Sequence, residues 1–564
     1  MKYSVKAMTA NVAQKSSPYT EANSQGRVFL SGVMVLTLST ILVKVIGLLY
    51  KIPMLHYLGS EGMGYFNAAY EWYGALCVIA TSGLPIASSM LIAGGIGQPQ
   101  KIRRIERLSM RLFGLLGILG ALFLFFGASR IALAIGSLDT RFAIAAVAPT
   151  VLFSCLCGAY RGYFQGYQYM VPTAVSQVIE ATGKLIFGLI FAHMAKRRGL
   201  SSPRVAAWAI LGLSLGVALS LLYLAIKRKL YRPKTNAMSA VTSIDCRKQR
   251  AVHPSLLHQL LGIAIPITIS SSVMNVTRLF DMAMILRRLQ YIGYDTSAAN
   301  ALYGNYTTMA IPIFNLIPSL ITSVALALVP TLSAAIQTKD SQTQRSSTQS
   351  AIRITALLSL PASFALVIYS KSILSLLFGN DPSVTAAAPM LSILAVSTFF
   401  SGIITTTNAI LQAYGHVNAP IFSMLIGALI KLIGAYALIG LPGIHIYGAP
   451  ISTFLCDTVI VAINFSLIAK YTDVLPSLRS AMVRPLLLSF ISVGIPGVFY
   501  ALLVRGGYSD ISLFFASIPV TVALYAILCL RCGMLGENEI AMLPLSLRTR
   551  LLKVCHFANS NLKQ

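Results

Sequence analysis

The chain has 564 residues, of which 56% are hydrophobic and only 11% are charged. Soluble domains carry about 25% charged residues, so this composition excludes a water-soluble fold, and it excludes intrinsic disorder and a coiled coil as well. The formal charge of +28 does not indicate nucleic-acid binding, because the basic residues concentrate in short segments between apolar runs. We therefore expect an integral membrane protein.

Apolar runs long enough to cross a bilayer as helices, at about 20 residues each, recur along the whole chain. They do not alternate polar and apolar residues as barrel strands do, so they predict an all-α fold. Kinks are expected at Pro85, Pro312 and Pro318. In chain order, the fourteen predicted transmembrane helices cover residues 29–50, 64–96, 109–129, 142–160, 171–194, 205–226, 256–286, 300–335, 350–370, 386–411, 419–439, 446–469, 483–504 and 511–530.

The arrangement of these spans predicts the topology. The first apolar run lacks a signal-peptide cleavage site, so we expect it to be retained, with both termini in the cytoplasm and the chain in the plasma membrane. Basic loops favour this orientation, except that the basic loop from Lys196 to Arg204 would lie outside. The expected parts are a cytoplasmic segment (1–28), an amino-terminal lobe of six spans (29–226), a basic cytoplasmic linker (227–255), a carboxy-terminal lobe of six spans (256–470), two further helices (483–530) and a cytoplasmic tail (531–564).

The two six-helix lobes share a sequence spacing. Gln165 precedes Lys184 by 19 residues, and Gln412 precedes Lys431 by the same interval. An even number of spans in each lobe gives both lobes the same orientation. The spacing therefore favours a parallel pseudo-twofold repeat, with coincidence between apolar segments as the alternative. Further matches are Tyr167 with Tyr414 and, one residue out of register, Pro172 with Pro420.

Catalytic and metal-binding motifs are absent from the sequence. The eight cysteines are scattered, and the pair Cys529 and Cys532 closes an apolar span without the context of a redox motif. The longest loop, 227–255, holds one acidic residue, Asp245, and no zinc or phosphate-loop spacing. We expect no enzyme activity, catalytic residue, metal or cofactor, although a coupling ion or the membrane potential could act on the protein.

Ionisable residues inside the spans are the candidate binding residues, because a charge at mid-bilayer costs several kcal/mol unless it faces protein, a partner or water. They could line a water-filled cavity that is partly basic and suited to a pyrophosphate, or they could be structural pairs. Both roles stay open for Glu180 and Lys184, whereas Asp457 is expected to be structural. The candidate pairs are Lys44 with Glu71 at similar depth, Glu180 with Lys184 on one helix face, Arg278 with Asp281 on another, and Lys431 with Asp457.

Four segments resemble a known family. They are Leu58–Tyr65 (LGSEGMGY), Thr81–Ala87 (TSGLPIA), Tyr160–Gly166 (YRGYFQG) and Pro172–Gln177 (PTAVSQ). Together with the span layout they resemble the stage V sporulation protein B-like polysaccharide transporters. That family belongs to the multidrug/oligosaccharidyl-lipid/polysaccharide exporter superfamily, which includes the lipid II flippases.

The resemblance implies two six-helix bundles around a central cavity and two extra carboxy-terminal helices. It implies export of an undecaprenyl-pyrophosphate-linked saccharide, with lipid II as the expected cargo, by alternating access. Its basic positions in the first span fall on Lys44 and near Lys51. The resemblance implies arginine where this chain has lysine, and lysine cannot make the paired hydrogen bonds that arginine makes to a phosphate. Glu71 would reduce the positive charge of this region.

Two other functions compete with a flippase. A cation-coupled multidrug antiporter of the same superfamily would use Glu71 and Glu180 for coupling. A membrane-embedded glycosyltransferase or polymerase would need a catalytic loop, which the sequence lacks. The expected partners are a lipid-linked oligosaccharide and membrane lipids, with cell-wall synthesis enzymes as candidates and no nucleic acid. The sugar, the coupling ion, the sporulation-specific or vegetative setting and the oligomeric state do not follow from the sequence.

Overall fold

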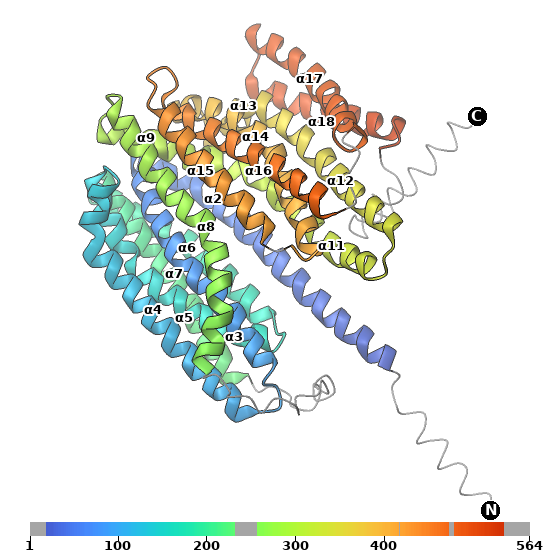
Figure 1. The fold of residues 1–564 in the computed structure, drawn as a ribbon. Coiled ribbons are helices and arrows are strands. Elements are labelled where there is room, and N and C mark those ends of the chain that lie inside the picture. Colours follow the sequence, from blue (N-terminus) through green and yellow to red (C-terminus); the bar gives the residue numbers. More distant parts are fainter. Residues whose placement is uncertain (1–17, 232–255, 417, 473–478, 535–564) are drawn as a thin grey trace, which may run out of the picture. The chain divides into compact units, whose positions relative to one another are not determined.

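The computed structural model describes residues 18–231, 256–416, 418–472 and 479–534, and every regular element in those ranges is a helix (Figure 1). The all-α prediction is thereby confirmed. Most of the expected linker and tail, residues 232–255 and 535–564, lies outside the described residues, as does 1–17.

The first eight helical elements run from residue 18 to residue 291. They are α2 (Pro18–Thr81), α3 (Gly83–Ala93), α4 (Pro99–Ala134), the short η1 (Leu138–Thr140), α5 (Arg141–Gly166), α6 (Val171–Arg197), α7 (Ser202–Leu230) and α8 (Leu256–Tyr291).

The remaining elements include two π-helices, η3 and η5, and several short helices. They are α9 (Thr296–Asn305), η3 (Tyr306–Ala310), α10 (Ile311–Phe314), α11 (Leu316–Gln337), α12 (Ser341–Ile368), α13 (Ser370–Phe378), α14 (Pro382–Ala413), α15 (Ala419–Ile439), η4 (His445–Tyr447), α16 (Gly448–Tyr471), η5 (Arg479–Val483), α17 (Arg484–Arg505) and α18 (Asp510–Arg531).

Eleven helical segments among the described residues are long and apolar enough to cross a membrane, or twelve if the bent pair Leu256–Ile269 and Ser271–Tyr291 of α8 counts as one span. The predicted number of fourteen is not confirmed. Part of the difference lies at Leu38–Ala93, which counts as one candidate of 56 residues although two helices meet within it at the non-helical Gly59, where we predicted two spans. The protein is therefore a multi-pass membrane protein.

The break predicted between residues 50 and 64 is present but is much shorter than the expected loop, because the residues on either side of Gly59 are helical. The helix is interrupted only at Gly59, whose φ of 68° and ψ of 176° lie outside the helical region. A positive φ is readily adopted by glycine, which has no Cβ to clash with the backbone. Gly59 alone therefore makes the break that we had assigned to a loop.

The helices break near the prolines that were expected to kink them. α2 ends at Thr81 and α3 begins at Gly83, so Pro85 falls in the first turn of α3. A second break near these prolines, at Asn315, separates α10 from α11 and precedes Pro318. Proline lacks a backbone N–H and clashes with the preceding turn, so a helix is most easily broken at these points.

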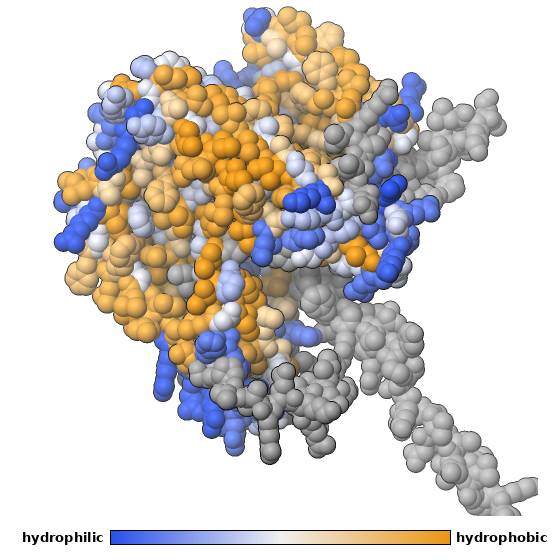
Figure 2. Space-filling view, in the orientation of Figure 1, coloured by the Kyte–Doolittle hydropathy of each residue, from blue (hydrophilic) through white to orange (hydrophobic). Residues whose placement is uncertain are grey.

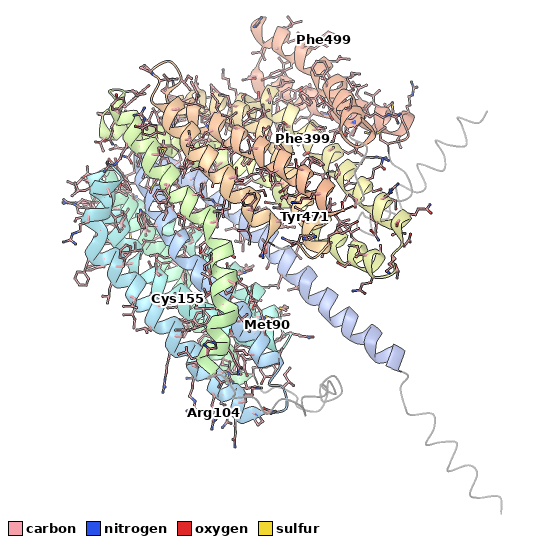
Figure 3. The ribbon with its side chains drawn as sticks, viewed as in Figure 1. Met90, Arg104, Cys155, Phe399, Tyr471 and Phe499 are labelled. Carbon is pink, nitrogen blue, oxygen red and sulfur yellow. The ribbon has the colours of Figure 1, made fainter. Side chains whose placement is uncertain are left out.

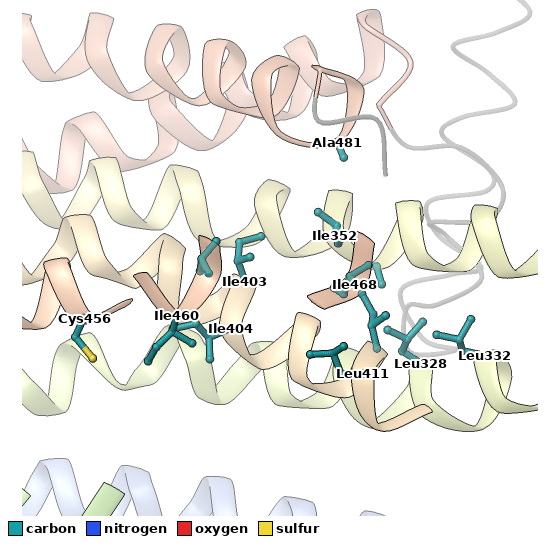
Figure 4. Close-up of a cluster of buried hydrophobic side chains, with 13 residues drawn as sticks. Leu328, Leu332, Ile352, Ile403, Ile404, Leu411, Cys456, Ile460, Ile468 and Ala481 are labelled. Atoms are coloured by element: carbon teal, nitrogen blue, oxygen red, sulfur yellow. The ribbon is translucent and has the colours of Figure 1, made fainter. Parts of the chain in front are cut away.

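The chain folds into two compact units, and each is described by itself. Unit 1 comprises Met1–Pro53, Trp72–Ala128 and Phe142–Ser272. Unit 2 comprises Met54–Glu71, Ser129–Arg141 and Val273–Gln564. In unit 2, aliphatic side chains from α11, α12, α14 and α16 interdigitate in a buried cluster that includes Leu332, Ile352, Ile403 and Ile460 (Figure 4).

Large apolar side chains remain on the outside of both units. On α4 in unit 1, Phe123 and Phe126 are 52% and 76% exposed, and on α17 in unit 2, Phe499 is 63% exposed. Figure 2 shows large areas of apolar surface. The basic residue Arg104, by contrast, lies near one end of α4 (Figure 3). Exposed apolar surface of this extent is expected of helices that face lipid.

The same turn recurs in both units and supports the predicted repeat. Gln168 and Gly415 each lie three residues after the matched glutamine, and both have a positive φ, 55° and 83°. The next residue stacks on a tyrosine at the end of a later helix. Tyr169 lies 5.2 Å from Tyr231 in unit 1, and His416 lies 4.1 Å from Tyr471 in unit 2, measured between ring centroids.

Close packing of α6 on α7 gives a test of unit 1. A Cβ added at Gly183 would lie 2.5 Å from the Cα of Gly216, whereas one added at Gly74 would meet nothing within 4 Å. We expect Gly183→Ala to lower the unfolding free energy by about 1–3 kcal/mol through overpacking. The matched Gly74→Ala should be neutral or stabilising by up to about 1 kcal/mol, because alanine favours a helix. Thermal unfolding in detergent would measure both, and equal midpoints would contradict the packing.

Candidate functional site

A cavity of about 240 Å³ lies within unit 2, among residues of α2, α8, η3, α14, α15 and α16. The structure brings five of the nine candidate residues to its wall. Because these residues come from four different helices, only the folded unit places them together. The five are Glu71 on α2, Arg278 and Asp281 on α8, Lys431 on α15 and Asp457 on α16.

Lys431 and Asp281 form an ion pair that joins α15 to α8. The Lys431 Nζ lies 2.7 Å from the Asp281 Oδ2, and the two side chains are 15% and 9% exposed. We expected Lys431 to pair with Asp457, so this partner is a correction. The sequence placed all three residues within spans, but only the rotation of each helix determines which carboxylate reaches the ammonium.

Asp457 is buried on α16 and forms no ion pair with any described residue. Its carboxylate instead accepts a hydrogen bond from the hydroxyl of Ser401 on α14. A single hydroxyl compensates a buried carboxylate less well than a cation would. Of the two buried acids on the wall, Asp281 and Asp457, Asp457 is therefore the less well compensated.

Arg278 and Asp281 share a face of α8, as their three-residue spacing predicted, and both line the cavity. Arg278 is exposed and, unlike Lys431, has no ion-pair partner among the described residues. Counting formal charges, the wall carries two cations, Arg278 and Lys431, and three carboxylates, Glu71, Asp281 and Asp457. Carboxylates outnumber cations here, by three to two.

Uncharged polar residues complete the wall and were missed by the sequence analysis. Ser401, Tyr306 and Thr453 line the same cavity. Beside them, the Asn67 side-chain amide donates to the hydroxyls of Thr307 and Thr308, at 2.9 and 2.7 Å, and holds α2 against η3. A search for ionisable groups could not find these residues, because serine, threonine and tyrosine are common in membrane helices for structural reasons.

Glu180 in unit 1 pairs with Arg161. Arg161 belongs to the Tyr160–Gly166 segment, and we did not predict it to be a site residue. The Arg161 guanidinium lies 2.8 Å from the Glu180 carboxylate, and its Nε donates to the Ser176 hydroxyl at 3.0 Å. Arg161 was overlooked because we ended the fourth span at residue 160. α5 continues to Gly166, so the guanidinium is held among α5, α6 and the Ser220 hydroxyl of α7.

Lys184 lies one helical turn beyond Glu180 and contacts an aromatic ring. Its ammonium lies 5.0 Å from the centroid of the buried Tyr50 ring, within range of a cation–π interaction. Glu180 forms a salt bridge with Arg161 of α5. Lys184, the partner that we predicted, lies one turn away on the same helix as Glu180.

The first-span candidates lie on α2. Lys44 is exposed and Lys51 is half-buried, and both belong to unit 1. Glu71 belongs to unit 2, so the predicted pairing of Lys44 with Glu71 stays a prediction. In the part of the chain that the structure describes, no three His, Cys, Asp or Glu side chains gather as metal ligands would.

Charged groups held between apolar helices, around a cavity inside a helical unit, are features of a multi-pass membrane transporter. Comparison with known proteins identifies the family. Residues 29–336 match the polysaccharide biosynthesis protein family, and the chain belongs to that family. Residues 266–437 also match the MatE family. The chain is thus a transporter of the multidrug/oligosaccharidyl-lipid/polysaccharide exporter superfamily, as the sequence resemblance implied.

Individual relatives agree with this placement. Over 527 residues, the chain is 26% identical to stage V sporulation protein B of Bacillus subtilis (strain 168), covering 92% of this chain and 98% of that protein. It is 26% identical over 425 residues to the lipid II flippase MurJ of the same organism, covering 72% and 76%.

Solved structures show the same fold. A lipid II flippase MurJ in an inward closed conformation superposes with a TM-score of 0.66 at 14% identity, covering 88% of this chain and 98% of that one. An inward-facing multidrug resistance MATE family transporter superposes with a TM-score of 0.58 at 14% identity, covering 75% and 97%. The relatives named for an activity are flippases and transporters, not enzymes.

The ion pair between Asp281 and Lys431 gives a prediction about stability. Asp281→Asn or Lys431→Met alone should leave one buried charge without its partner, at a cost of about 3–5 kcal/mol. The double variant removes both charges and should recover most of the folded yield. Yield and melting temperature in detergent would be measured for all three variants. Single variants as stable as the unaltered protein would show that the pair has no structural role.

Proposed function

We propose that this protein is a flippase that moves an undecaprenyl-pyrophosphate-linked saccharide across the plasma membrane by alternating access, with lipid II as the expected cargo. The observation that carries the proposal is Arg278, a cation on the wall of the unit 2 cavity that no described carboxylate engages. Such a cation is costly in a bilayer unless the protein uses it.

The chemistry of the cavity wall fits a pyrophosphate. A guanidinium offers a planar fork of N–H donors that matches phosphate oxygens, and its charge shortens and strengthens those hydrogen bonds. Lys431 could contribute a second positive charge, although Asp281 holds it at 2.7 Å. The hydroxyls of Ser401 and Thr453 add polar groups of the kind that hydrogen-bond a sugar.

The membrane arrangement that goes with this proposal has both termini in the cytoplasm. The basic segments after Leu230 and before Leu256 support it, because basic residues are retained on the cytoplasmic side. Cell-wall synthesis enzymes would supply or consume the cargo. A coupling ion or the membrane potential would drive the transport, since the sequence contains no phosphate-binding loop for ATP.

A cation-coupled multidrug antiporter is the second candidate function, and one observation favours it. Three carboxylates line the cavity against two cations, and Asp457 is buried with only the Ser401 hydroxyl as a partner. Carboxylates of this kind can bind a proton, an inorganic cation or a cationic drug. The fold accommodates this function as well, because multidrug transporters share it.

Arg278 provides the test of the flippase. In a strain depleted of its lipid II flippase, the unaltered protein should restore growth, and Arg278→Gln should abolish rescue because the phosphate loses its guanidinium. Arg278→Lys keeps the charge and should rescue partially. Growth is scored together with the amount of protein in the membrane.

Arg505→Gln is the matched control for Arg278→Gln. Arg505 is also exposed in unit 2, at the last turn of α17, but it does not line the cavity. The Arg505→Gln variant should restore growth fully. Full rescue by Arg278→Gln would remove the phosphate-binding role. Failure of the unaltered protein, at normal membrane abundance, would exclude lipid II as the cargo and favour the antiporter.

Lys44 in the first span gives a second test in unit 1. It stands in an apolar stretch several residues from either interface, so its ammonium cannot easily reach water by extending along the helix. We expect Lys44→Gln to abolish rescue and Lys44→Arg to retain it, since arginine keeps the charge. Normal growth with Lys44→Gln, in the same assay, would contradict a role of this charge in transport.

A further inference from the structure

A second cavity, of about 650 Å³, lies in unit 1 at the beginning of α4 and of the described part of α8. None of the nine candidate transport residues lines it. Its wall is formed by Gln98, Pro99, Gln100, Lys101, Arg104, Leu256 and Gln259. We propose that this pocket binds the phosphate-bearing head group of an anionic membrane lipid.

Positive charge dominates this pocket. Lys101 and Arg104 are three residues apart on α4, so they lie on the same face of the helix, and no acidic residue is part of the wall. The acid nearest along α4 is Glu106, whose carboxylate already accepts two hydrogen bonds from Arg228, at 2.6 and 2.7 Å. The two cations of the pocket are therefore not neutralised by it.

The backbone and the side-chain amides add hydrogen-bond donors. α4 begins at Pro99, so the N–H groups of Gln100 and Lys101 belong to its first turn and have no acceptor within the helix. The first turn also carries the positive end of the helix dipole, which favours a phosphate. Gln98, Gln100 and Gln259, whose side chains carry amide groups, line the same pocket.

The surroundings indicate that the phosphate belongs to a lipid. Beyond its basic start, α4 exposes Leu115, Leu119 and Phe123, at 52–55%, and α8 exposes Ile265 and Ile269, at 51% and 63%. Acyl chains can lie on these apolar side chains while the head group occupies the pocket. Basic pockets beside membrane helices bind anionic head groups in this manner.

The end of unit 1 that holds the pocket is basic beyond the pocket itself. The Arg228–Glu106 ion pair brings the last turn of α7, with Lys227, Arg228 and Lys229, to the start of α4. Figure 3 shows Arg104 near this end of α4. A basic end faces the cytoplasm by the positive-inside rule, and the cytoplasmic leaflet is the one rich in anionic lipid.

Native mass spectrometry of the purified full chain in detergent would test the pocket, with phosphatidylglycerol as the probe and phosphatidylcholine as the zwitterionic comparison. We expect phosphatidylglycerol to bind more tightly. Because one basic residue contributes about 1 kcal/mol at an anionic membrane surface, Lys101→Gln and Arg104→Gln should each weaken it about fivefold, and the double variant about 25-fold.

Arg103→Gln is the matched control, because Arg103 is an exposed neighbour on α4 that does not line the pocket. It should bind as the unaltered protein does. Equal weakening by Arg103→Gln would mean diffuse attraction without a site, and would overturn the proposal.

Inorganic pyrophosphate is added as a competitor, to distinguish a lipid from a soluble anion. A lipid site should retain phosphatidylglycerol when pyrophosphate is present at equal concentration. Displacement at equal concentration, or equal binding of phosphatidylcholine, would also overturn the proposal. Melting temperatures of the variants verify that each is folded, and they separate this test from the outcome of the flippase rescue.

Discussion

A charged side chain inside a bilayer needs a compensating charge, a dipole or water, and the polar interior of this protein is organised by that requirement. In unit 2 the requirement joins α8 to α15 through Asp281 and Lys431, which lie 2.7 Å apart. In unit 1 it joins α5 to α6 through Arg161 and Glu180, at 2.8 Å. Apolar packing against lipid gives helices little preference for one neighbour over another, whereas a buried ion pair fixes both the neighbour and the rotation of each helix.

The two halves of the chain have kept the same local geometry but have diverged in their charges. The turn after α5 and the turn after α14 both have a residue with positive φ, followed by a ring that stacks on a tyrosine. Lys184 and Lys431 hold equivalent positions in the repeat. Lys431 pairs with a carboxylate, whereas Lys184 lies over the Tyr50 ring. The two turns therefore share their backbone geometry, while these contacts of the two equivalent lysines differ.

The sequence was sufficient for those properties that depend on composition and spacing. Apolar length predicted a bundle of membrane helices, though not their number, and the cost of a buried charge selected the five charged residues that line the unit 2 cavity. Partner choice could not be predicted, because Lys431 is within reach of Asp281 or Asp457 depending on helix rotation. Arg161 was missed for a simpler reason, a span that ended six residues too early. Gly59 shows a third limit, since a one-residue break and a short loop have the same composition.

The charges on the wall of the unit 2 cavity bear on both proposed functions. Asp281 pairs with Lys431, and the wall also carries Arg278, Glu71 and Asp457. With every acid ionised, the wall carries one more carboxylate than cations and favours a cation over a pyrophosphate; any acid that is protonated moves this balance toward an anion. Asp457 is buried and accepts a hydrogen bond from the Ser401 hydroxyl. If an acid of this wall takes up a proton, anion binding and that protonation favour each other, so the flippase and antiporter proposals differ in which ligand the same charges would serve.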